Sequence, residues 1–153
     1  MRNPHLSDDK EAVVWYAVGD RNESGREARR HGDETIMQRR VLIADERRRS
    51  RSGLRAVLAL RPEIQVVGEV VNGRGAVRLV EELRPDVVLM DGRLPVVDGL
   101  EVTRLIKERW RGVRIIVLTI QAGYRADALA AGADGFLVKG CPSEELSKAI
   151  LDR

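Results

Sequence analysis

From residue 41 onward, short runs of consecutive apolar residues alternate with longer segments in which apolar residues recur every three or four positions. A run such as 87–90, which leaves no polar position to face solvent, predicts a strand buried on both sides, and the periodic segments predict amphipathic helices. We expect strands at 41–44, 64–71, 87–90, 115–118 and 136–138, and helices at 50–60, 76–83, 99–110 and 125–131, with a last helix starting at 142.

Strands that alternate with helices form βαβ units around one parallel sheet covered on both faces. Right-handed crossovers then give a doubly wound sheet. With the second strand at an edge, the expected strand order is 2-1-3-4-5, the flavodoxin-like arrangement. The sequence therefore predicts an α/β fold with a single folded domain over residues 39–153.

Residues 1–38 lack this pattern, because they are charged, contain glycine and have only one apolar run, at 12–18. We expect a disordered or non-native N-terminal extension. The apolar run leaves open a short strand or helix that packs on the domain.

Composition narrows the function classes. The chain has 153 residues and a net charge of +3, which is too mild for the concentrated basic face of a nucleic-acid binder. One cysteine excludes an intrachain disulfide, and both histidines precede residue 32, so a His/Cys metal cluster is excluded from the main body. Because the chain also has no long apolar run and no signal peptide pattern, we expect a cytoplasmic protein.

Polar side chains follow four of the predicted strands. Asp45 and Glu46 follow the first, Asp91 the third, Thr119 the fourth and Lys139 the fifth. Since parallel strands share one direction, these residues are expected to meet at one edge of the sheet, where α/β proteins bind ligands. Crowded carboxylates need a cation, and oxygen ligands favour Mg²⁺. An aspartate nucleophile at such a site can form an acyl phosphate.

Five segments together resemble the receiver domain of two-component response regulators, particularly the NarL/FixJ type that carries a LuxR-like DNA-binding domain. The resembling segments are Val-Leu-Ile-Ala-Asp-Glu (41–46), Val-Val-Gly-Glu-Val (66–70), Arg-Pro-Asp-Val-Val-Leu-Met-Asp (84–91), Leu-Pro-Val-Val-Asp-Gly (94–99) and Ala-Gly-Ala-Asp-Gly-Phe-Leu-Val-Lys (131–139). Each segment alone is weakly specific, whereas the combination is highly specific.

The resemblance implies a phosphoacceptor and a metal site. Asp91 would take a phosphoryl group from a phosphohistidine of a sensor histidine kinase. Asp45, Glu46 and Asp91 would hold Mg²⁺ together with the backbone carbonyl of Arg93. The acidic pair here is Asp-Glu instead of the family's common Asp-Asp, which lengthens one arm of the site.

The resemblance also implies groups that bind the phosphate and switch the conformation. Lys139 and Thr119 would contact phosphoryl oxygens, and Thr119 and Phe136 would move when phosphate arrives. Thr119 and Lys139 are 20 positions apart, a shorter spacing than is typical of the family. The domain is expected to be a phosphoacceptor with at most slow self-catalysed phosphorylation and dephosphorylation, and not an enzyme.

The sequence does not indicate which process the receiver would control. The chain ends in its last predicted helix with no output domain, so we expect either a fragment of a transcription regulator that binds DNA through another domain, or a stand-alone receiver. A homodimer is left open. Two rival functions are a dinucleotide-binding module, because Gly73-Arg74-Gly75 follows a strand, and an aspartyl phosphatase. The first lacks its third glycine, and the second lacks a general acid, because Arg93 stands two residues after Asp91.

Overall fold

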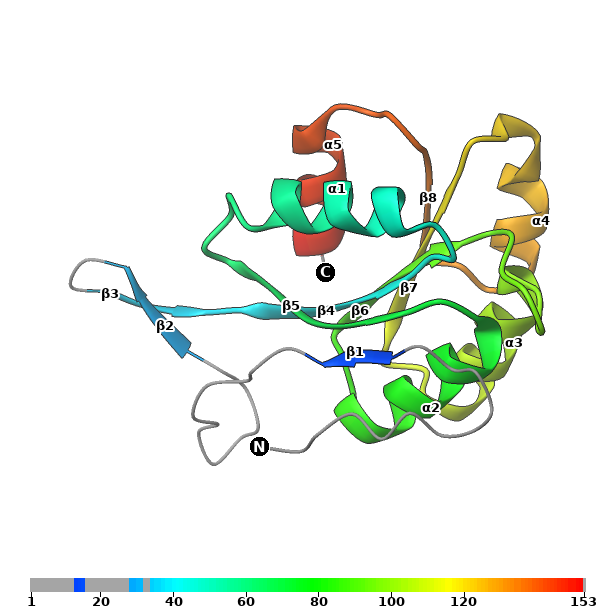
Figure 1. Cartoon of the computed structure of the whole chain (residues 1–153), viewed down its shortest axis with the longest axis horizontal. Helices are drawn as coiled ribbons and strands as arrows, with labels where there is room; N and C mark the ends of the chain where they lie inside the picture. Colours follow the sequence, from blue (N-terminus) through cyan, green and yellow to red (C-terminus); the bar gives the residue numbers. More distant parts are fainter. Residues whose placement is uncertain (1–12, 16–27, 32–33, 153) are drawn as a thin grey trace.

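A computed structural model describes residues 13–15, 28–31 and 34–152 of the chain (Figure 1). In these residues, a sheet with the strand order β1-β5-β4-β6-β7-β8 forms the centre. Its parallel strands are β4 (Arg39–Ala44), β5 (Ile64–Val70), β6 (Val87–Asp91), β7 (Arg114–Thr119) and β8 (Gly135–Val138). Their order confirms the expected 2-1-3-4-5 sheet.

Helices cover both faces of this sheet. On one side lie α1 (Arg48–Leu58) and α5 (Ser143–Leu151), and on the other α2 (Gly73–Leu83) and α3 (Gly99–Arg109) (Figure 1). The short helix α4 (Arg125–Ala130) follows a 3₁₀ turn, η1 (Ala122–Tyr124). The sequence predicted all five helices within a few residues but not the 3₁₀ turn. Within the described residues, no helix is both long and apolar enough to cross a membrane.

The buried strand residues divide between two hydrophobic clusters. In β4, Val41 and Ile43 pack on the α1 and α5 side, whereas Leu42 and Ala44 pack on the side of α2 and α3. Successive side chains of a strand point to opposite faces, so a sheet covered on both faces requires apolar residues at every position. This alternation explains the unbroken apolar run at 41–44 in β4.

The N-terminal region adds strands outside the predicted sheet. Strand β1 (Val13–Trp15), within the apolar run 12–18, pairs antiparallel with the edge strand β5. Strands β2 (Ala28–His31) and β3 (Glu34–Met37) form a separate antiparallel pair. The predicted disorder falls mainly on residues 1–12, 16–27 and 32–33, which lie outside the described residues.

The Gly73-Arg74-Gly75 turn has a packing role. A Cβ on Gly73 would lie 2.2 Å from the carbonyl oxygen of Val97, and one on Gly75 would lie 2.3 Å from a methyl group of Val70. Both glycines therefore let the first turn of α2 approach β5 and the loop after β6. This close packing accounts for the two glycines without a bound nucleotide.

Candidate functional site

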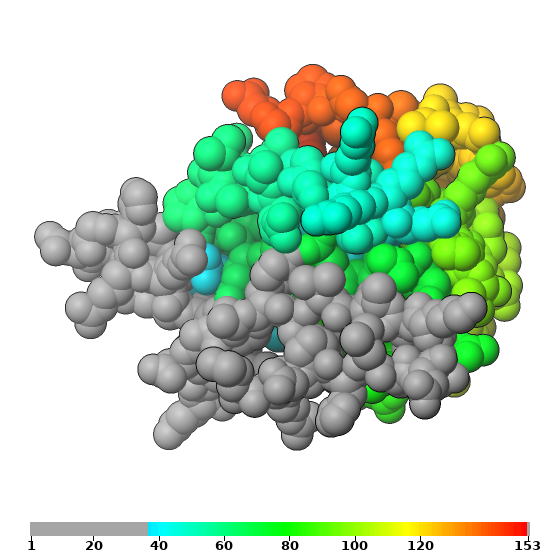
Figure 2. Space-filling view, viewed as in Figure 1, coloured from blue at the N-terminus to red at the C-terminus, as the bar shows by residue number. Residues whose placement is uncertain are grey.

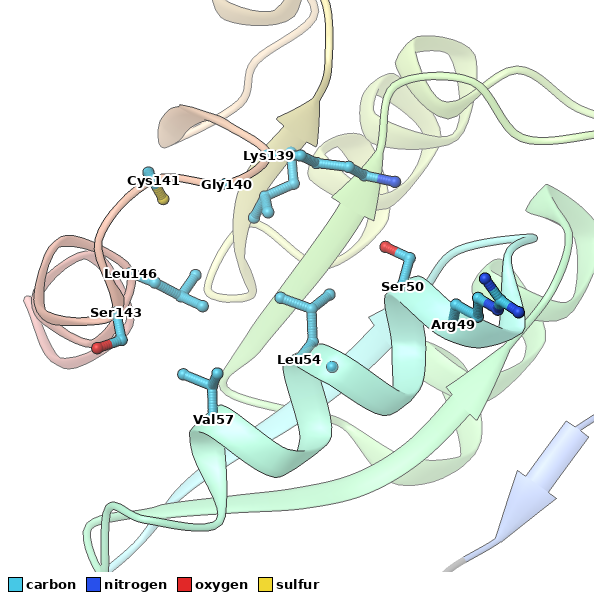
Figure 3. Close-up of a pocket in the computed structure, with 11 residues that line it drawn as sticks. Arg49, Ser50, Leu54, Val57, Lys139, Gly140, Cys141, Ser143 and Leu146 are labelled. Atoms are coloured by element: carbon cyan, nitrogen blue, oxygen red, sulfur yellow. The ribbon is translucent and has the colours of Figure 1, made fainter.

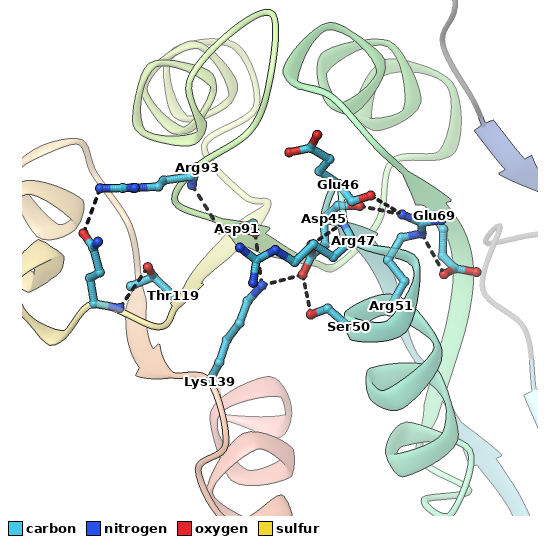
Figure 4. A network of polar contacts seen from close by, with 11 residues as sticks. Asp45, Glu46, Arg47, Ser50, Arg51, Glu69, Asp91, Arg93, Thr119 and Lys139 are labelled. Atoms are coloured by element: carbon cyan, nitrogen blue, oxygen red, sulfur yellow. Dashed lines mark hydrogen bonds and ion pairs between the residues drawn. The ribbon is translucent and has the colours of Figure 1, made fainter.

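A lysine joins two carboxylates at the carboxyl edge of the sheet. Lys139, which follows β8, places its Nζ 2.7 Å from Oδ2 of Asp45 and 3.1 Å from Oδ2 of Asp91 (Figure 4). Asp45 directly follows β4, and Asp91 is the last residue of β6. The side chains of Asp45 and Asp91 are only 2% and 11% exposed. The structure thus brings together three residues that the sequence placed at the ends of separate strands.

Asp45 is held by the first turn of α1. Its Oδ1 accepts a hydrogen bond from the backbone N–H of Arg47 at 2.8 Å, and its Oδ2 accepts one from Oγ of Ser50 at 2.5 Å. Burial alone would raise the pKa of Asp45, but the hydrogen bonds from Lys139, Ser50 and Arg47 outweigh it and lower the pKa. Asp45 is therefore an ionised carboxylate with a fixed orientation.

The carboxylate of Asp91 accepts fewer hydrogen bonds than the carboxylate of Asp45. Its Oδ1 accepts one from the backbone N–H of Arg93 at 3.0 Å. Burial raises the pKa of Asp91, and the bonds from Arg93 and Lys139 offset this only in part. The backbone behind it is closely packed, because a Cβ on Gly99, the first residue of α3, would lie 2.1 Å from the carbonyl oxygen of Asp91.

Glu46 does not join the other two carboxylates. Its side chain is exposed and points away from Lys139 (Figure 4). In the part of the chain that the structure describes, no three His, Cys, Asp or Glu side chains are arranged to hold a metal ion. The converging oxygen donors are therefore those of Asp45 and Asp91. Two carboxylates with retained water are a donor set that suits Mg²⁺.

Thr119 lies at the end of β7, beside the segment that carries Lys139. Its carbonyl oxygen accepts a hydrogen bond from the backbone N–H of Lys139 at 2.9 Å. Its hydroxyl is buried and accepts a hydrogen bond from the backbone N–H of Gln121 at 3.3 Å. Phe136 in β8 is half-buried and packs against the core cluster on the α2 and α3 side.

The Arg93 side chain makes contacts that the sequence did not indicate. Its guanidinium donates hydrogen bonds to Oε1 of Gln121 at 3.0 Å and to the hydroxyl of Tyr124 at 3.2 Å. The guanidinium carbon also lies 5.5 Å from the centre of the Tyr124 ring, within the range of a cation–π contact. Arg93 therefore links the loop after Asp91 to the loop after Thr119.

A known protein family matches most of the chain, including all the site residues described above. Residues 41–151 match the response regulator receiver domain family. The chain belongs to this family. A receiver domain of a two-component response regulator is a signalling domain rather than a classical enzyme.

Relatives and solved structures lead to the same family. The receiver is 38% identical over 112 residues to the transcriptional regulatory protein DegU of Brevibacillus brevis, which covers 72% of this chain and 48% of DegU. It is 35% identical over 113 residues to the nitrate/nitrite response regulator protein NarL of Escherichia coli, covering 72% of this chain and 52% of NarL. The chain thus spans about half the length of these curated relatives.

Among solved structures, the signal receiver domain of the putative response regulator NarL from Mycobacterium tuberculosis superposes with a TM-score of 0.71 at 32% identity. That match covers 75% of this chain and 94% of the other. A LuxR-family two-component response regulator from Aurantimonas gives a TM-score of 0.70 at 34% identity, covering 74% of this chain and 82% of the other.

An apolar groove of about 250 Å³ lies beside the receiver's acidic site. Leu54 and Val57 of α1 face Leu146 of α5 across it, with Cys141 at the end of the groove near Lys139 (Figure 3). Burial and the charge of Glu145 raise the pKa of the Cys141 thiol, which keeps it protonated.

The surface at the start of α1 is strongly basic. Arg47, Arg48 and Arg49 are consecutive and exposed. In Figure 2 this part of the chain, in cyan, carries side chains that project into solvent. Positive charge therefore lies beside the buried carboxylates.

Proposed function

We propose that Asp91 is the phosphoacceptor of this receiver. The contact that most supports this role is the bridge from Lys139 to both Asp45 and Asp91, because it gathers a nucleophile, a second carboxylate and a cation in one place. A carboxylate oxygen of Asp91 would attack the phosphorus, so that an O–P bond forms while the bond from phosphorus to the donor breaks. Such a transfer depends mainly on positioning and charge neutralisation.

The carboxylates would hold Mg²⁺ during this transfer. Asp45 and Asp91 already converge, and the backbone carbonyl of Arg93 would add a third oxygen. Glu46 would turn inward, which its exposed position permits. When bound, Mg²⁺ neutralises charge on the phosphoryl oxygens.

Lys139 and Thr119 would stabilise the phosphorylated state. Once Asp91 carries phosphate, the ammonium of Lys139 would move from the carboxylate to a phosphoryl oxygen, a charge-assisted hydrogen bond. The hydroxyl of Thr119 would give up its hydrogen bond from the N–H of Gln121 and move toward a phosphoryl oxygen. Phe136 in the neighbouring strand β8 would then repack. The loops after β7 and β8 would exist in two conformations, and phosphorylation would raise the population of one of them.

The biological setting follows from the proposed chemistry. The phosphoryl donor would be the phosphohistidine of a sensor histidine kinase in the cytoplasm. The output would be control of transcription, as the name of the transcriptional regulatory protein DegU suggests. It would be exerted through a DNA-binding domain, with a homodimer as one form of the active state. Self-catalysed phosphorylation and dephosphorylation would be slow.

Labelling by a small phosphodonor tests this function. Incubated with acetyl phosphate and Mg²⁺, the chain should gain one phosphoryl group, detected by intact-mass spectrometry. Asp91→Asn should abolish the labelling, because an amide oxygen does not form the acyl phosphate. Removal of Mg²⁺ with a chelator should abolish it as well.

Asp98→Asn is the matched control. Asp98 is exposed and caps α3 by accepting a hydrogen bond from the N–H of Leu100, a role that asparagine also fills. This variant should be labelled like the native chain. Labelling of Asp91→Asn at the native level would contradict the proposed function.

A further inference from the structure

A buried glutamate lies in the edge region of the sheet, on strand β5. Glu69 is 4% exposed, and its backbone neighbours are Ile43 in β4 and Val14 in β1. Its carboxylate forms ion pairs with two arginines of α1, at 3.3 Å to Nε of Arg51 and 3.3 Å to Nη1 of Arg55. A carboxylate buried in this way needs such partners, because an unpaired buried charge is strongly unfavourable.

Arg51 also contacts the loop that carries the acidic pair. Its Nη1 donates hydrogen bonds to the carbonyl oxygen of Asp45 at 2.9 Å and to that of Glu46 at 3.0 Å (Figure 4). The Arg51 side chain is 11% exposed. One guanidinium therefore connects a buried carboxylate on β5 to two of the peptide groups between β4 and α1.

We propose that Arg51 and Glu69 are positioning residues for the Mg²⁺ site, an inference that rests on the proposed function. Arg51 fixes the backbone from which the side chains of Asp45 and Glu46 project, and Glu69 fixes Arg51. Neither residue contacts the phosphate. Their effect is on the position and orientation of Asp45 and Glu46, two of the three carboxylates that would hold the metal.

The geometry of arginine makes this role specific. A planar guanidinium presents several N–H groups in fixed directions, so it can bind Glu69 with one nitrogen and two carbonyl oxygens with another. A lysine ammonium carries all its N–H donors on one nitrogen, so it does not reproduce the separate directions of the guanidinium nitrogens. Arg51→Lys should therefore keep the charge and lose the positioning.

The experiment separates positioning from ordinary stabilisation. Mg²⁺ binding to the full chain is measured by isothermal titration calorimetry for the native protein, Glu69→Gln, Arg51→Lys and Arg55→Gln. Glu69→Gln and Arg51→Lys should bind Mg²⁺ about tenfold more weakly, the effect typical of residues that orient metal ligands. Arg55 is the matched control, because it pairs with the same carboxylate one helical turn further along α1. Arg55→Gln should bind Mg²⁺ with native affinity.

A second measurement needs no metal. The amide of Arg47 is hydrogen-bonded to Asp45, so its hydrogen exchange reports on the order of this loop. By NMR, that amide should exchange faster in Arg51→Lys and at the native rate in Arg55→Gln.

Native Mg²⁺ affinity and native exchange in Arg51→Lys and Glu69→Gln would overturn the inference. If the ion pair only stabilised the fold, its loss in Glu69→Gln would lower the melting temperature and leave Mg²⁺ affinity and amide exchange unchanged. That result would also contradict the inference. If the native chain bound no Mg²⁺, the proposed metal site itself would fail, and the amide exchange would still decide whether Arg51 orders the loop.

Discussion

Two aspartates that share one lysine have opposite pKa shifts. Asp45 receives hydrogen bonds from Lys139, Ser50 and the backbone of Arg47, and these lower its pKa against the effect of burial. For Asp91, burial is the larger effect and raises the pKa. Asp91 is thus the less satisfied of the two carboxylates and the one with more to gain from a new cation.

Neutralising each aspartate should therefore change stability in opposite directions. A lowered pKa means that the ionised Asp45 stabilises the fold, a contribution present above the pKa of the unfolded chain and lost as pH falls through the folded pKa. A raised pKa means that the ionised Asp91 destabilises the fold at neutral pH, and that this cost disappears as pH falls through its folded pKa. In urea unfolding at pH 7, Asp45→Asn should lose about 1–3 kcal/mol, and Asp91→Asn should be more stable than the native chain.

Asp127→Asn provides the comparison for these two variants. Asp127 is exposed on α4, away from the ion pairs of Lys139. Its unfolding free energy should stay within about 0.5 kcal/mol of the native value. Equal destabilisation by Asp45→Asn and Asp91→Asn would show that the two carboxylates are not differently stabilised.

At the level of elements, the 3₁₀ turn η1 depends on a side chain from another loop. The N–H of Arg125 donates a hydrogen bond to the carbonyl of Ala122, and the N–H of Tyr124 donates one to the carbonyl of Gln121 at 3.2 Å. Arg93 adds side-chain bonds to Gln121 and Tyr124. The loop after Asp91 thereby orders the loop after Thr119, which is where the proposed switch begins.

Removing Arg93 should loosen this turn. In Arg93→Ala the amide of Tyr124 should exchange with solvent about fivefold faster, which corresponds to about 1 kcal/mol for the lost hydrogen bonds. Tyr124→Phe loses one bond but keeps the ring under the guanidinium, so its effect should be smaller. Hydrogen exchange followed by NMR measures both.

Arg125→Ala is the control for this pair, since Arg125 is exposed and is the residue that follows η1. Its Tyr124 amide should exchange at the native rate. An unchanged rate in Arg93→Ala would mean that the turn is stable without the contact.

For the whole molecule, the sequence predicted the topology because each buried strand needs apolar residues on both faces, as Val41 to Ala44 show. It also predicted that Asp45, Asp91 and Lys139 meet, since parallel strands end at one edge of the sheet. It also placed Glu46 in this cluster, whereas the Glu46 side chain is exposed and points away from Lys139. The orientation of an exposed side chain is set mainly by its own rotamers and not by the strand that it follows.

Contacts between separate elements were the other part that the sequence left undetermined. Glu69 pairs with Arg51 across 18 positions, and Arg93 reaches Tyr124 across 31. Nothing in a residue's own periodicity indicates such partners. The available signal was Glu69 itself, a charged residue inside the largely apolar strand 64–71, which calls for a buried partner.

The position of the phosphoryl group can be read directly from the protein. Reduction of the acetyl phosphate-treated chain with borohydride converts an aspartyl phosphate to homoserine, and peptide mass spectrometry then locates it. Homoserine is expected at position 91, and only when Mg²⁺ is present during the treatment. Homoserine at another aspartate, with position 91 unmodified, would contradict the proposed role of Asp91.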